Sequence, residues 1–467
     1  MTETTTLQAR MHDELREQTL FDLAQQDVRA YLQTILERPV FPTAAALSGL
    51  TAFAEPLPAH SSTAASVLEQ LHQHGSPATV ATLGGRYFGF VTGSSLPIGL
   101  AAKQLATYWD QNSAMHIMSP ITSTLETVVE GWLRELFNLP PDTVASYVSG
   151  TSTANLCGLA AARYRLLERQ GWDLNVQGVF GAPKLRIVTS RQSHSAVLKA
   201  VMMLGFGTGN IEWVDVDSQG RIIPEALPEL DDRTIVVLQA GNVNSGSFDP
   251  FTEICQRASA VGAWVHIDGA FGLWAGAVGP LQHLTQGMEL AHSWAVDGHK
   301  TLNTPYDCGI LLCADRAALA AAMQVKASYL VMGENRDGMS YTPEMSRRAR
   351  VVELWAILRY LGREGIAELV YGLHQRATQF AQEIQALPGF TILNDVVFNQ
   401  VVVCCANDEL TDKTLVRMQA SGECWAGGSI WRERKVIRVS VCSWATTPAD
   451  ITRSVAAFRQ ALEEASR

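Results

Sequence analysis

The chain has 467 residues, of which 47% are hydrophobic and 18% are charged. This composition excludes a disordered chain and is long enough for two or three domains with full-sized cores. The formal net charge is -10 and no block of Lys and Arg occurs, so nucleic acid is not an expected partner.

The sequence carries no sign of secretion, membrane insertion or metal binding. Residues 1–18 are polar with early acids, unlike a signal peptide, and the apolar stretch 269–284 is broken by glycines and a proline. The eight cysteines show neither C-x-x-C spacing nor a zinc-finger histidine. We therefore expect buried reduced thiols, a cytoplasmic protein and no metal site.

The first region, residues 1–85, is predicted to be a helical N-terminal segment. Residues 13–37 place apolar side chains at helical spacing, and the prolines that follow end the pattern. Such a segment cannot bury its own apolar face, so we expect it to pack on another domain or on a partner subunit.

The second region, residues 86–344, alternates short apolar runs with helical stretches and is predicted to be an α/β domain. Continuous apolar strands of this kind indicate a mainly parallel sheet that is covered on both faces. The predicted strands are 143–148, 186–190, 234–239, 263–268, 293–297 and 309–314, and the predicted helices between them are 155–170, 195–205 and 249–262.

The third region, residues 345–467, is predicted to be a small α+β domain. A long helix is predicted over 344–365, and strands are predicted over 398–406 and 435–443. No repeats or low-complexity tracts occur.

Polar residues follow the predicted strands, where a parallel sheet places its ligand. Gly150, Thr151 and Ser152 open a helix after the first strand, which suits a phosphate but also suits a capped turn. Asp268 ends a predicted strand. It is either an anion that pairs with a cationic ring nitrogen or a residue that simply forms a turn.

Two further positions complete the pattern. His194 in a strand-to-helix loop is either an aromatic plate for a flat ligand or a satisfied loop histidine. Lys300 is either a surface lysine or a Schiff-base lysine. The chain order of phosphate turn, plate, acid and lysine meets the needs of one cofactor, pyridoxal 5′-phosphate (PLP).

These motifs resemble the fold-type I PLP enzymes and, within them, the group II amino-acid decarboxylases. The resemblance covers residues 80–460 and rests on RYFGFVTGSSLP, SPITSTLETVVEGWL, SGTSTANLCGLAAAR, SHSAV, GSFDP, HIDGAFG, DGHKTLNTPYDCG, SYL, SRRAR and IRVSVCS. It implies a large domain with a mainly parallel seven-stranded sheet, a small C-terminal domain, and a homodimer with the active site at the subunit interface.

The resemblance also implies the cofactor contacts. Lys300 would form the internal aldimine, Asp268 would pair with the ring nitrogen, and His194 would stack on the ring. The remaining implied contacts are Thr151, Ser152 and His299 at the phosphate, Ala270 against the ring and Asn244 near the phenolic oxygen.

For the substrate, the resemblance implies Thr92 near the carboxylate, with Phe90 in the pocket. Tyr329 falls where related decarboxylases place the tyrosine that protonates the carbanion, although a packing tyrosine is the ordinary alternative. Arg438 is either a bidentate partner of a substrate carboxylate or a strand arginine in an ion pair.

Three departures from the family pattern limit this transfer. Residues 242–244 read Asn-Val-Asn where threonines are common, and the sequence does not say which asparagine meets the cofactor. Asp297 lies near the expected phosphate, so it must turn away or find a cation. Thr301 follows the lysine where a large aromatic residue is common.

The expected reaction is decarboxylation of an L-amino acid to an amine and CO2 through an external aldimine. Another PLP reaction is the first alternative, namely a carbon–carbon lyase, an aldehyde synthase or an aminotransferase, and a catalytically silent PLP-binding protein is the second. The substrate is not readable: Phe90, Tyr108 and Trp109 suggest an apolar pocket, whereas Asp110 and Gln111 suggest a polar substrate.

Overall fold

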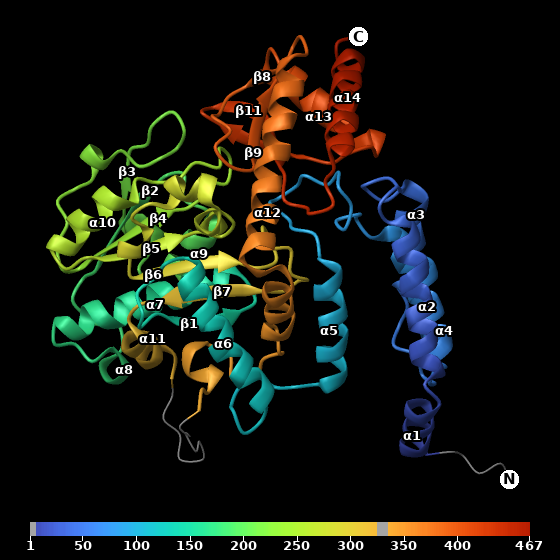
Figure 1. The fold of residues 1–467 in the computed structure, drawn as a ribbon, viewed down its shortest axis with the longest axis horizontal. Helices are drawn as coiled ribbons and strands as arrows, with labels where there is room; N and C mark the ends of the chain where they lie inside the picture. The colour runs from blue at the N-terminus through green and yellow to red at the C-terminus, as the bar shows by residue number, and fades with distance from the viewer. Residues whose placement is uncertain (1–5, 325–334) are drawn as a thin grey trace.

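A computed structural model describes residues 6–324 and 335–467. Seven strands form a central sheet in the order β1-β7-β6-β5-β4-β2-β3 (Figure 1). Strands β3, β2, β4, β5 and β6 run parallel, and β7 is antiparallel to β1 and β6, so the predicted mainly parallel sheet is confirmed. The strand bounds are β1 (Val144–Val148), β2 (Arg186–Ser190), β3 (Ile211–Val214), β4 (Thr234–Gln239), β5 (Trp264–Asp268), β6 (Ser293–Asp297) and β7 (Gly309–Cys313).

Helices cover both faces of this sheet, as the continuous apolar strands require. Along β4, Val236 and Leu238 enter one hydrophobic cluster, whereas Ile235 and Val237 enter the other. The first cluster includes α6 (Pro120–Leu136), α10 (Phe251–Ala260) and the start of α12 (Val351–Gln385). The second includes α7 (Thr151–Arg169), α9 (Ser195–Met203) and α11 (Arg316–Met323), and the short α8 (Leu174–Gln177) follows α7.

Two differences from the predicted elements have physical reasons. Strand β3 was not predicted because it is a four-residue edge strand in which Glu212 interrupts the apolar run; Glu212 pairs with Arg186 of β2 at 2.6 Å. Helix α12 begins at Val351 rather than near 344, because Arg348 forms an isolated β-bridge with Asn112 and the Arg347 carbonyl accepts the Ser113 N–H at 2.9 Å.

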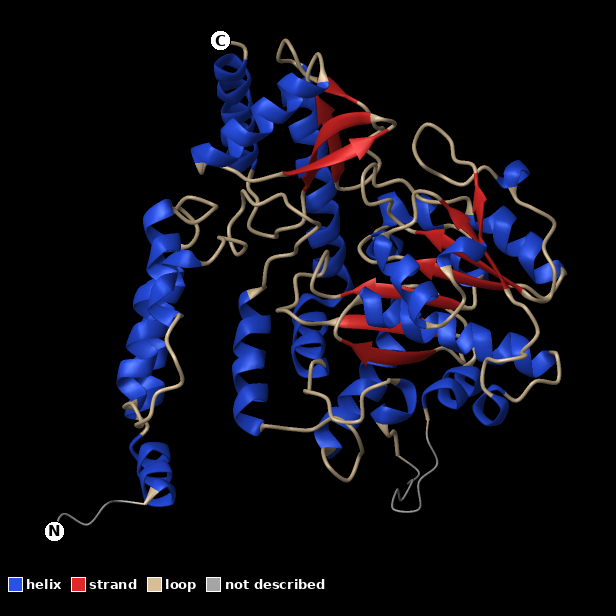
Figure 2. Cartoon of the chain, turned by 180° about the vertical axis from the view of Figure 1, so that it is seen from behind, coloured by secondary structure: helices blue, strands red, loops and turns tan. Residues whose placement is uncertain are grey.

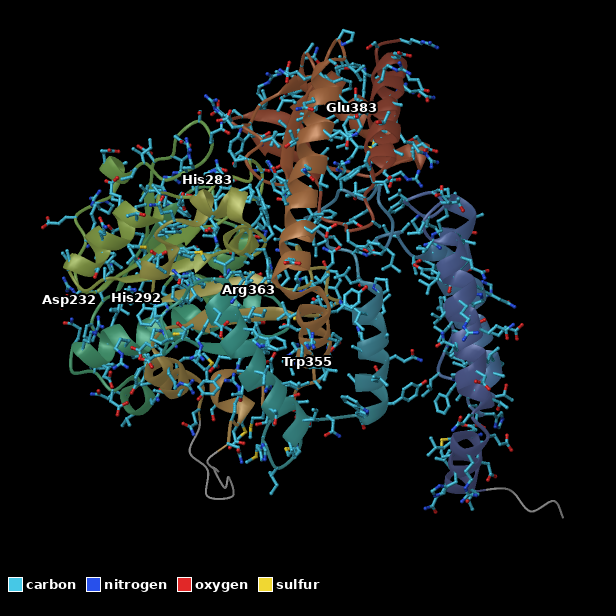
Figure 3. All side chains as sticks on the ribbon, viewed as in Figure 1. Asp232, His283, His292, Trp355, Arg363 and Glu383 are labelled. Carbon is cyan, nitrogen blue, oxygen red and sulfur yellow. The ribbon has the colours of Figure 1, made fainter. Side chains whose placement is uncertain are left out.

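A second, antiparallel sheet lies beside the C-terminal half of α12, in the order β10-β11-β9-β8 (Figure 2). Its bounds are β8 (Thr391–Ile392), β9 (Gln400–Cys404), β10 (Gly427–Trp431) and β11 (Arg434–Ser440), and α13 (Asp408–Ser421) and α14 (Pro448–Ala465) pack beside it. Helix α12 links the two sheets, and its Trp355, labelled in Figure 3, stacks on Trp132 of α6 at 6.3 Å. The boundaries drawn at 85 and 344 stay predictions.

The N-terminal region is helical and stands beside the rest of the chain (Figures 1 and 2). None of its helices contains a buried residue. A largely apolar cavity of about 720 Å³ separates α2 from α5. The bounds are α1 (Leu7–Glu17), α2 (Thr19–Thr34), α3 (Ala44–Gly49), α4 (Ala64–Gln70) and α5 (Pro97–Trp109). Within the described ranges, no helix has the length and apolarity to span a membrane.

Candidate active site

The predicted site residues follow the carboxyl ends of four neighbouring parallel strands. Strand β2 leads to His194, β4 to Asn244, β5 ends in Asp268, and β6 ends three residues before Lys300. Because the strands lie in the order β6-β5-β4-β2, these ends share one edge of the sheet. A ligand site is expected at such an edge.

Asp268 is buried at the end of β5, with 5% of its surface exposed. Its Oδ2 accepts a hydrogen bond from Asn155 Nδ2 at 3.0 Å, and its Oδ1 accepts the Ala270 N–H at 3.2 Å. Both oxygens keep acceptor capacity, so the carboxylate can take a further donor, such as a protonated ring nitrogen. The Ala270 carbonyl accepts the Asp297 N–H at 2.9 Å, which ties the ends of β5 and β6 together.

The start of α7 is occupied by a carboxylate. Asp297 Oδ1 accepts the Thr151 N–H at 2.7 Å, and its Oδ2 accepts the Thr151 hydroxyl. Lys300 Nζ lies 3.2 Å from Asp297 Oδ2, so Lys300 is the cation that pairs with this buried acid. Ser152, next on the helix, is exposed. The backbone N–H groups of this helix start are therefore arranged for an anion.

His299 presents an N–H donor to the same place. Its Nδ1 accepts the Cys308 N–H at 3.0 Å, so the proton of the neutral ring lies on Nε2, which is 3.6 Å from Asp297 Oδ2. Burial is the main cause that lowers the pKa of His299 and keeps the ring neutral. The ring stacks on Tyr306 with centroids 4.4 Å apart.

Two glycines allow this close packing. A Cβ on Gly309 would overlap the backbone of Gly150, and a Cβ on Gly150 would lie 3.3 Å from His299 Cε1. Strand β7 can therefore run directly against the start of α7. The Thr151 donors and the His299 Nε2–H are groups that can donate to a phosphate, and the buried Asp268 fits a pyridinium nitrogen, so the residues present fit PLP.

The loop 86–96 lies against the backbone of the lysine. A Cβ on Gly93 would overlap the Lys300 carbonyl, which shows how closely the two segments approach. The loop carries two of the predicted substrate residues, Phe90 and Thr92. Thr92 is half-buried, and its hydroxyl acts against the burial that raises the pKa of Tyr306 to about 12.

Asn303 fastens this loop to the lysine and to the small sheet. It is fully buried with φ +58°, a conformation that asparagine tolerates better than most residues. Its Nδ2 donates to the carbonyls of Lys300 (3.0 Å), Thr301 (2.9 Å) and Cys442 (2.9 Å). Its Oδ1 accepts the N–H groups of Ser94 (3.2 Å) and Trp444 (2.9 Å). One side chain thus joins three segments.

Aromatic side chains lie beside Phe90. Its ring and that of Tyr87 lie 5.4 Å and 5.2 Å from the ring of Trp425, which comes from the loop before β10. Phe90 is 65% exposed in the single chain. Tyr108 does not join this group, since it packs on Phe21 of the N-terminal segment with centroids 5.5 Å apart.

His194 is the N-cap of α9 and lies within electrostatic reach of the other site residues. Its Nδ1 accepts the Ala196 N–H at 3.2 Å, so its proton lies on Nε2. Burial is the main cause that lowers its pKa; the charge of Asp268 opposes this shift, and the charges of Lys300 and Arg438 add to it. His194, Asp268 and Lys300 thus follow neighbouring strand ends on one edge of the sheet, and Arg438 belongs to β11 of the small sheet.

Arg438 is a half-buried residue of β11, and burial lowers its pKa. Among the described residues it takes part in no ion pair within 4.0 Å, although carboxylates pair with most other partly buried arginines of the chain. Of its two predicted roles, an ion pair within the chain therefore finds no support in the described residues.

The two asparagines of the 240–250 turn differ in their contacts. Asn242 Oδ1 accepts the N–H groups of Asn244 (2.9 Å) and Ser245 (3.2 Å), so it shapes the turn itself. Asn244 Oδ1 accepts the Ser429 hydroxyl of β10 at 2.7 Å, which links the turn to the small sheet. Tyr329 lies outside the described residues.

Sequence reasoning missed Asn303, Trp425, and the buried pair Asn155 and His266. Asn303 had a readable signal, because an asparagine three residues after the lysine and before a Thr-Pro pair suggests a left-handed turn position. The others had none, since their partners come from distant parts of the chain.

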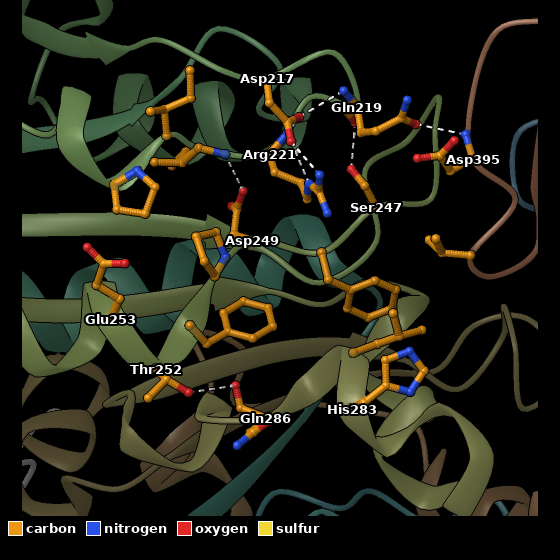
Figure 4. A pocket seen from close by; sticks show the side chains of 18 residues that line it. Asp217, Gln219, Arg221, Ser247, Asp249, Thr252, Glu253, His283, Gln286 and Asp395 are labelled. Carbon is orange, nitrogen blue, oxygen red and sulfur yellow. Dashed lines mark hydrogen bonds and ion pairs between the residues drawn. The ribbon is translucent and has the colours of Figure 1, made fainter.

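A second cavity, of about 560 Å³, lies apart from this site (Figure 4). It is lined by residues that include Asp217, Arg221, Asp249 and His283, and by none of the predicted site residues. Asp249 accepts the backbone N–H groups of Ile222 (2.8 Å) and Gln239 (2.7 Å), so its role there is to hold two segments together.

Comparison with known proteins agrees with this geometry. The pyridoxal-dependent decarboxylase conserved domain matches residues 53–405. Tyrosine decarboxylase 2 of Narcissus pseudonarcissus is 26% identical over 415 residues, which cover 82% of this chain and 81% of that protein. The 4-hydroxyphenylacetaldehyde synthase of Rhodiola rosea is 25% identical over 427 residues, which cover 86% of each protein.

The fold comparison points the same way. The crystal structure of Oryza sativa TDC with PLP and tryptamine has a TM-score of 0.88 to this chain at 20% identity, and the match covers 99% of both chains. The predicted fold type I architecture is confirmed. The chain belongs to the pyridoxal-dependent decarboxylase family, and it is a carboxy-lyase whose cofactor is PLP.

Proposed function

We propose that the protein removes the carboxylate of an L-amino acid as CO2 and releases the corresponding amine. The observation that carries the proposal is the placing of Asp268 and Lys300 at neighbouring strand ends on one edge of the sheet. These two residues serve the cofactor. The half-buried Arg438 of β11, which takes part in no ion pair among the described residues, offers a site for the substrate carboxylate. Of the two relatives named above, one is a tyrosine decarboxylase and the other is a 4-hydroxyphenylacetaldehyde synthase, which supports the reaction class.

Different residues of the site hold different parts of the cofactor. Lys300 supplies the amine that binds it covalently, and Asp268 holds the proton on its ring nitrogen. Thr151, Ser152 and His299 Nε2–H take the phosphate, while His194 and Ala270 lie against the ring. Asn244 is proposed beside the phenolic oxygen. When bound, PLP supplies the electron sink for the bond that breaks at Cα.

The substrate is oriented by the small sheet and by the loop 86–96. Arg438 binds a carboxylate of the substrate through two parallel hydrogen bonds. Thr92 lies at the carboxylate that leaves as CO2. Phe90 contacts the substrate side chain. The half-buried setting removes water from the carboxylate, which favours its loss as neutral CO2.

The proton that replaces CO2 on Cα is assigned to Tyr329, with His194 Nε2–H as the second donor. The lowered pKa of His194 keeps it neutral, and neutral imidazole is a weak acid. Replacing Tyr329 with Phe should therefore abolish amine formation. Unchanged amine output would remove Tyr329 from the reaction.

The proposed function is tested by supplying each of the twenty amino acids to the PLP-loaded protein and measuring CO2 and amine. CO2 and the matching amine from one amino acid are expected. An aldehyde with ammonia would instead assign the aldehyde-synthase reaction, and a keto acid would assign transamination. No product with any amino acid would return the protein to a silent PLP-binding role.

We also propose an obligate homodimer with the active site at the subunit interface. The N-terminal helices expose apolar side chains and bury none, and the 720 Å³ cavity between α2 and α5 is lined mainly by such side chains. A partner subunit would cover these surfaces. Light scattering should give twice the chain mass, whereas a monomer that keeps its activity on dilution would contradict the proposal.

We propose a cytoplasmic location as well. All eight cysteines are buried and free, which fits a reducing compartment. Cell fractionation would test this, and recovery of the protein in a secreted fraction would contradict it.

A further inference from the structure

Five buried residues form a continuous hydrogen-bonded chain that begins at Asp268 and runs away from the site. Asn155 Nδ2 lies 3.0 Å from Asp268 Oδ2, and Asn155 Oδ1 lies 2.9 Å from His266 Nε2. His266 Nδ1 lies 2.8 Å from Ser293 Oγ, which in turn lies 3.0 Å from Trp264 Nε1. Asn155, His266 and Ser293 have no exposed surface.

The chemistry of the groups fixes the direction of this chain. Trp264 Nε1–H can only donate, so Ser293 Oγ accepts from it and directs its own proton to His266 Nδ1. His266 then carries its proton on Nε2 and donates it to Asn155 Oδ1. Asn155 is left with its Nδ2 toward Asp268. Every donor therefore points toward the carboxylate.

The reverse direction has a specific cost. It would turn Asn155 Oδ1 toward Asp268 Oδ2, and two acceptors can face each other only if the carboxyl group is protonated. It would also make His266 Nδ1–H a second donor to Ser293, whose own proton would lose its acceptor. The observed direction thus belongs to the ionised form of Asp268.

The surroundings hold His266 in this role. A Cβ on Gly158 of α7 would lie 2.7 Å from His266 Cε1, which shows that only a glycine lets the ring pack this closely on the helix. Burial lowers the pKa of His266 to about 3, so the ring stays neutral and keeps one donor and one acceptor.

We propose that Asn155 and His266 are positioning residues that hold Asp268 as a carboxylate, and that through it they retain the proton on the ring nitrogen of PLP. The inference rests on the proposed pairing of Asp268 with that nitrogen. Neither residue is assigned a contact with the cofactor: Asn155 donates to Asp268, and His266 donates to Asn155 and so fixes the orientation of its amide.

The test uses PLP labelled with 15N in the ring, bound to the holoenzyme and read by solid-state NMR. Asn155→Leu keeps the approximate size of the side chain but removes both its donor and its acceptor. We expect the nitrogen resonance to move toward that of an unprotonated pyridine, and kcat to fall about tenfold or more. A wild-type resonance in Asn155→Leu would overturn the inference.

A second pair of variants separates the chain from simple packing. His266→Gln can still accept from Ser293 and donate to Asn155, whereas His266→Leu cannot. The resonance should stay near the wild-type value in His266→Gln and shift in His266→Leu. Equal resonances in both variants, with only the melting temperature lowered, would show that His266 is structural and would overturn the inference.

Failure here is distinguishable from failure of the proposed function. These variants keep Lys300, so the cofactor stays covalently bound and visible by its absorbance, whichever resonance is found. If the wild-type protein itself shows an unprotonated ring nitrogen, the assignment of Asp268 is wrong. If the ring nitrogen is protonated in the wild-type protein and equally so in the variants, the assignment of Asp268 stands. The hydrogen-bonded chain of Asn155 and His266 then has no role in protonating the ring.

Discussion

The carboxylate of Asp297 lies 3.2 Å from the amine of Lys300, at the point where the cofactor phosphate is expected. The same carboxylate takes the Thr151 N–H at 2.7 Å, one of the donors that a phosphate would use. An anion of the chain and an anion of the cofactor therefore compete for one set of donors.

Asp297→Asn should consequently bind PLP more tightly. The change removes a negative charge within a few ångströms of the phosphate, and a gain of about tenfold is expected for a charge in a partly buried site. The dissociation constant is measured by titrating PLP into the protein freed of cofactor. Glu409→Gln, which alters an exposed ion pair with Lys413, serves as the control. Weaker binding by Asp297→Asn would show that the acid helps to hold the cofactor.

Asn303 should matter for both stability and substrate binding, because its side chain joins the lysine, the substrate loop and the small sheet. Asn303→Gly keeps the φ of +58° accessible while it removes the hydrogen bonds of both the Nδ2 and the Oδ1 of the side chain. A loss of about 2–4 kcal/mol in the free energy of unfolding is expected, with a raised KM. Urea denaturation and steady-state kinetics measure the two effects.

A comparison variant isolates the backbone contribution. Asn303→Ala removes the same hydrogen bonds and also forces a Cβ into the left-handed region, so it should be less stable than Asn303→Gly by about 1 kcal/mol. If Asn303→Gly unfolds at the same urea concentration as the wild-type protein and keeps its KM, the joining role is wrong.

Arg438 should act on the substrate and not on the cofactor. Arg438→Lys keeps the charge but loses the paired donors, and Arg438→Ala loses both. KM should rise about tenfold in the first variant and more in the second, while PLP absorbance and affinity stay unchanged. Substrate titration followed by the change in absorbance gives the numbers. A loss of PLP with unchanged KM would move Arg438 from the substrate to the cofactor.

His292, labelled in Figure 3, should contribute to acid sensitivity. Its Nδ1 accepts the Val265 N–H at 3.0 Å, and burial lowers its pKa to about 4. The pKa of the folded state lies below that of the unfolded state, near 6.5. The unfolded chain therefore binds more protons between these values, and stability is lost as the pH falls from 6.5 to 4.

His292→Asn keeps an acceptor for Val265 and removes the titration. As the pH falls from 6.5 to 4, the free energy of unfolding of the variant should decrease by roughly 3 kcal/mol less than that of the wild-type protein. Urea denaturation at several pH values measures the slope. Parallel slopes would mean that His292 does not titrate in this way.

Much of the fold was predictable because most strands are short apolar runs that can be recognised in the sequence. The run 263–268 is apolar except for His266 before it ends in an acid, and it forms β5 with Asp268 at its end. Strand β3 was missed because Glu212 breaks the pattern, and β10 was missed because it begins with two glycines, Gly427 and Gly428. Local composition does not reveal a strand whose place is set by its neighbours.

The candidate site was predictable where one short motif carries one role, as at Lys300 and Asp268. The supporting contacts were not predictable, because they join residues far apart in the sequence. Asn155 and His266 are separated by 111 positions, and Asn303 and Cys442 by 139. Only the folded sheet brings α7 against β5, and only the packing of the small sheet brings β11 to the lysine.

Lys300 is proposed to hold the cofactor covalently. Borohydride reduction of the PLP-loaded protein, followed by proteolysis and mass spectrometry of the labelled peptide, tests this assignment. We expect a single pyridoxyl group on the peptide that contains Lys300, and none in Lys300→Ala. A label on a different lysine, or visible cofactor absorbance that persists in Lys300→Ala, would contradict it.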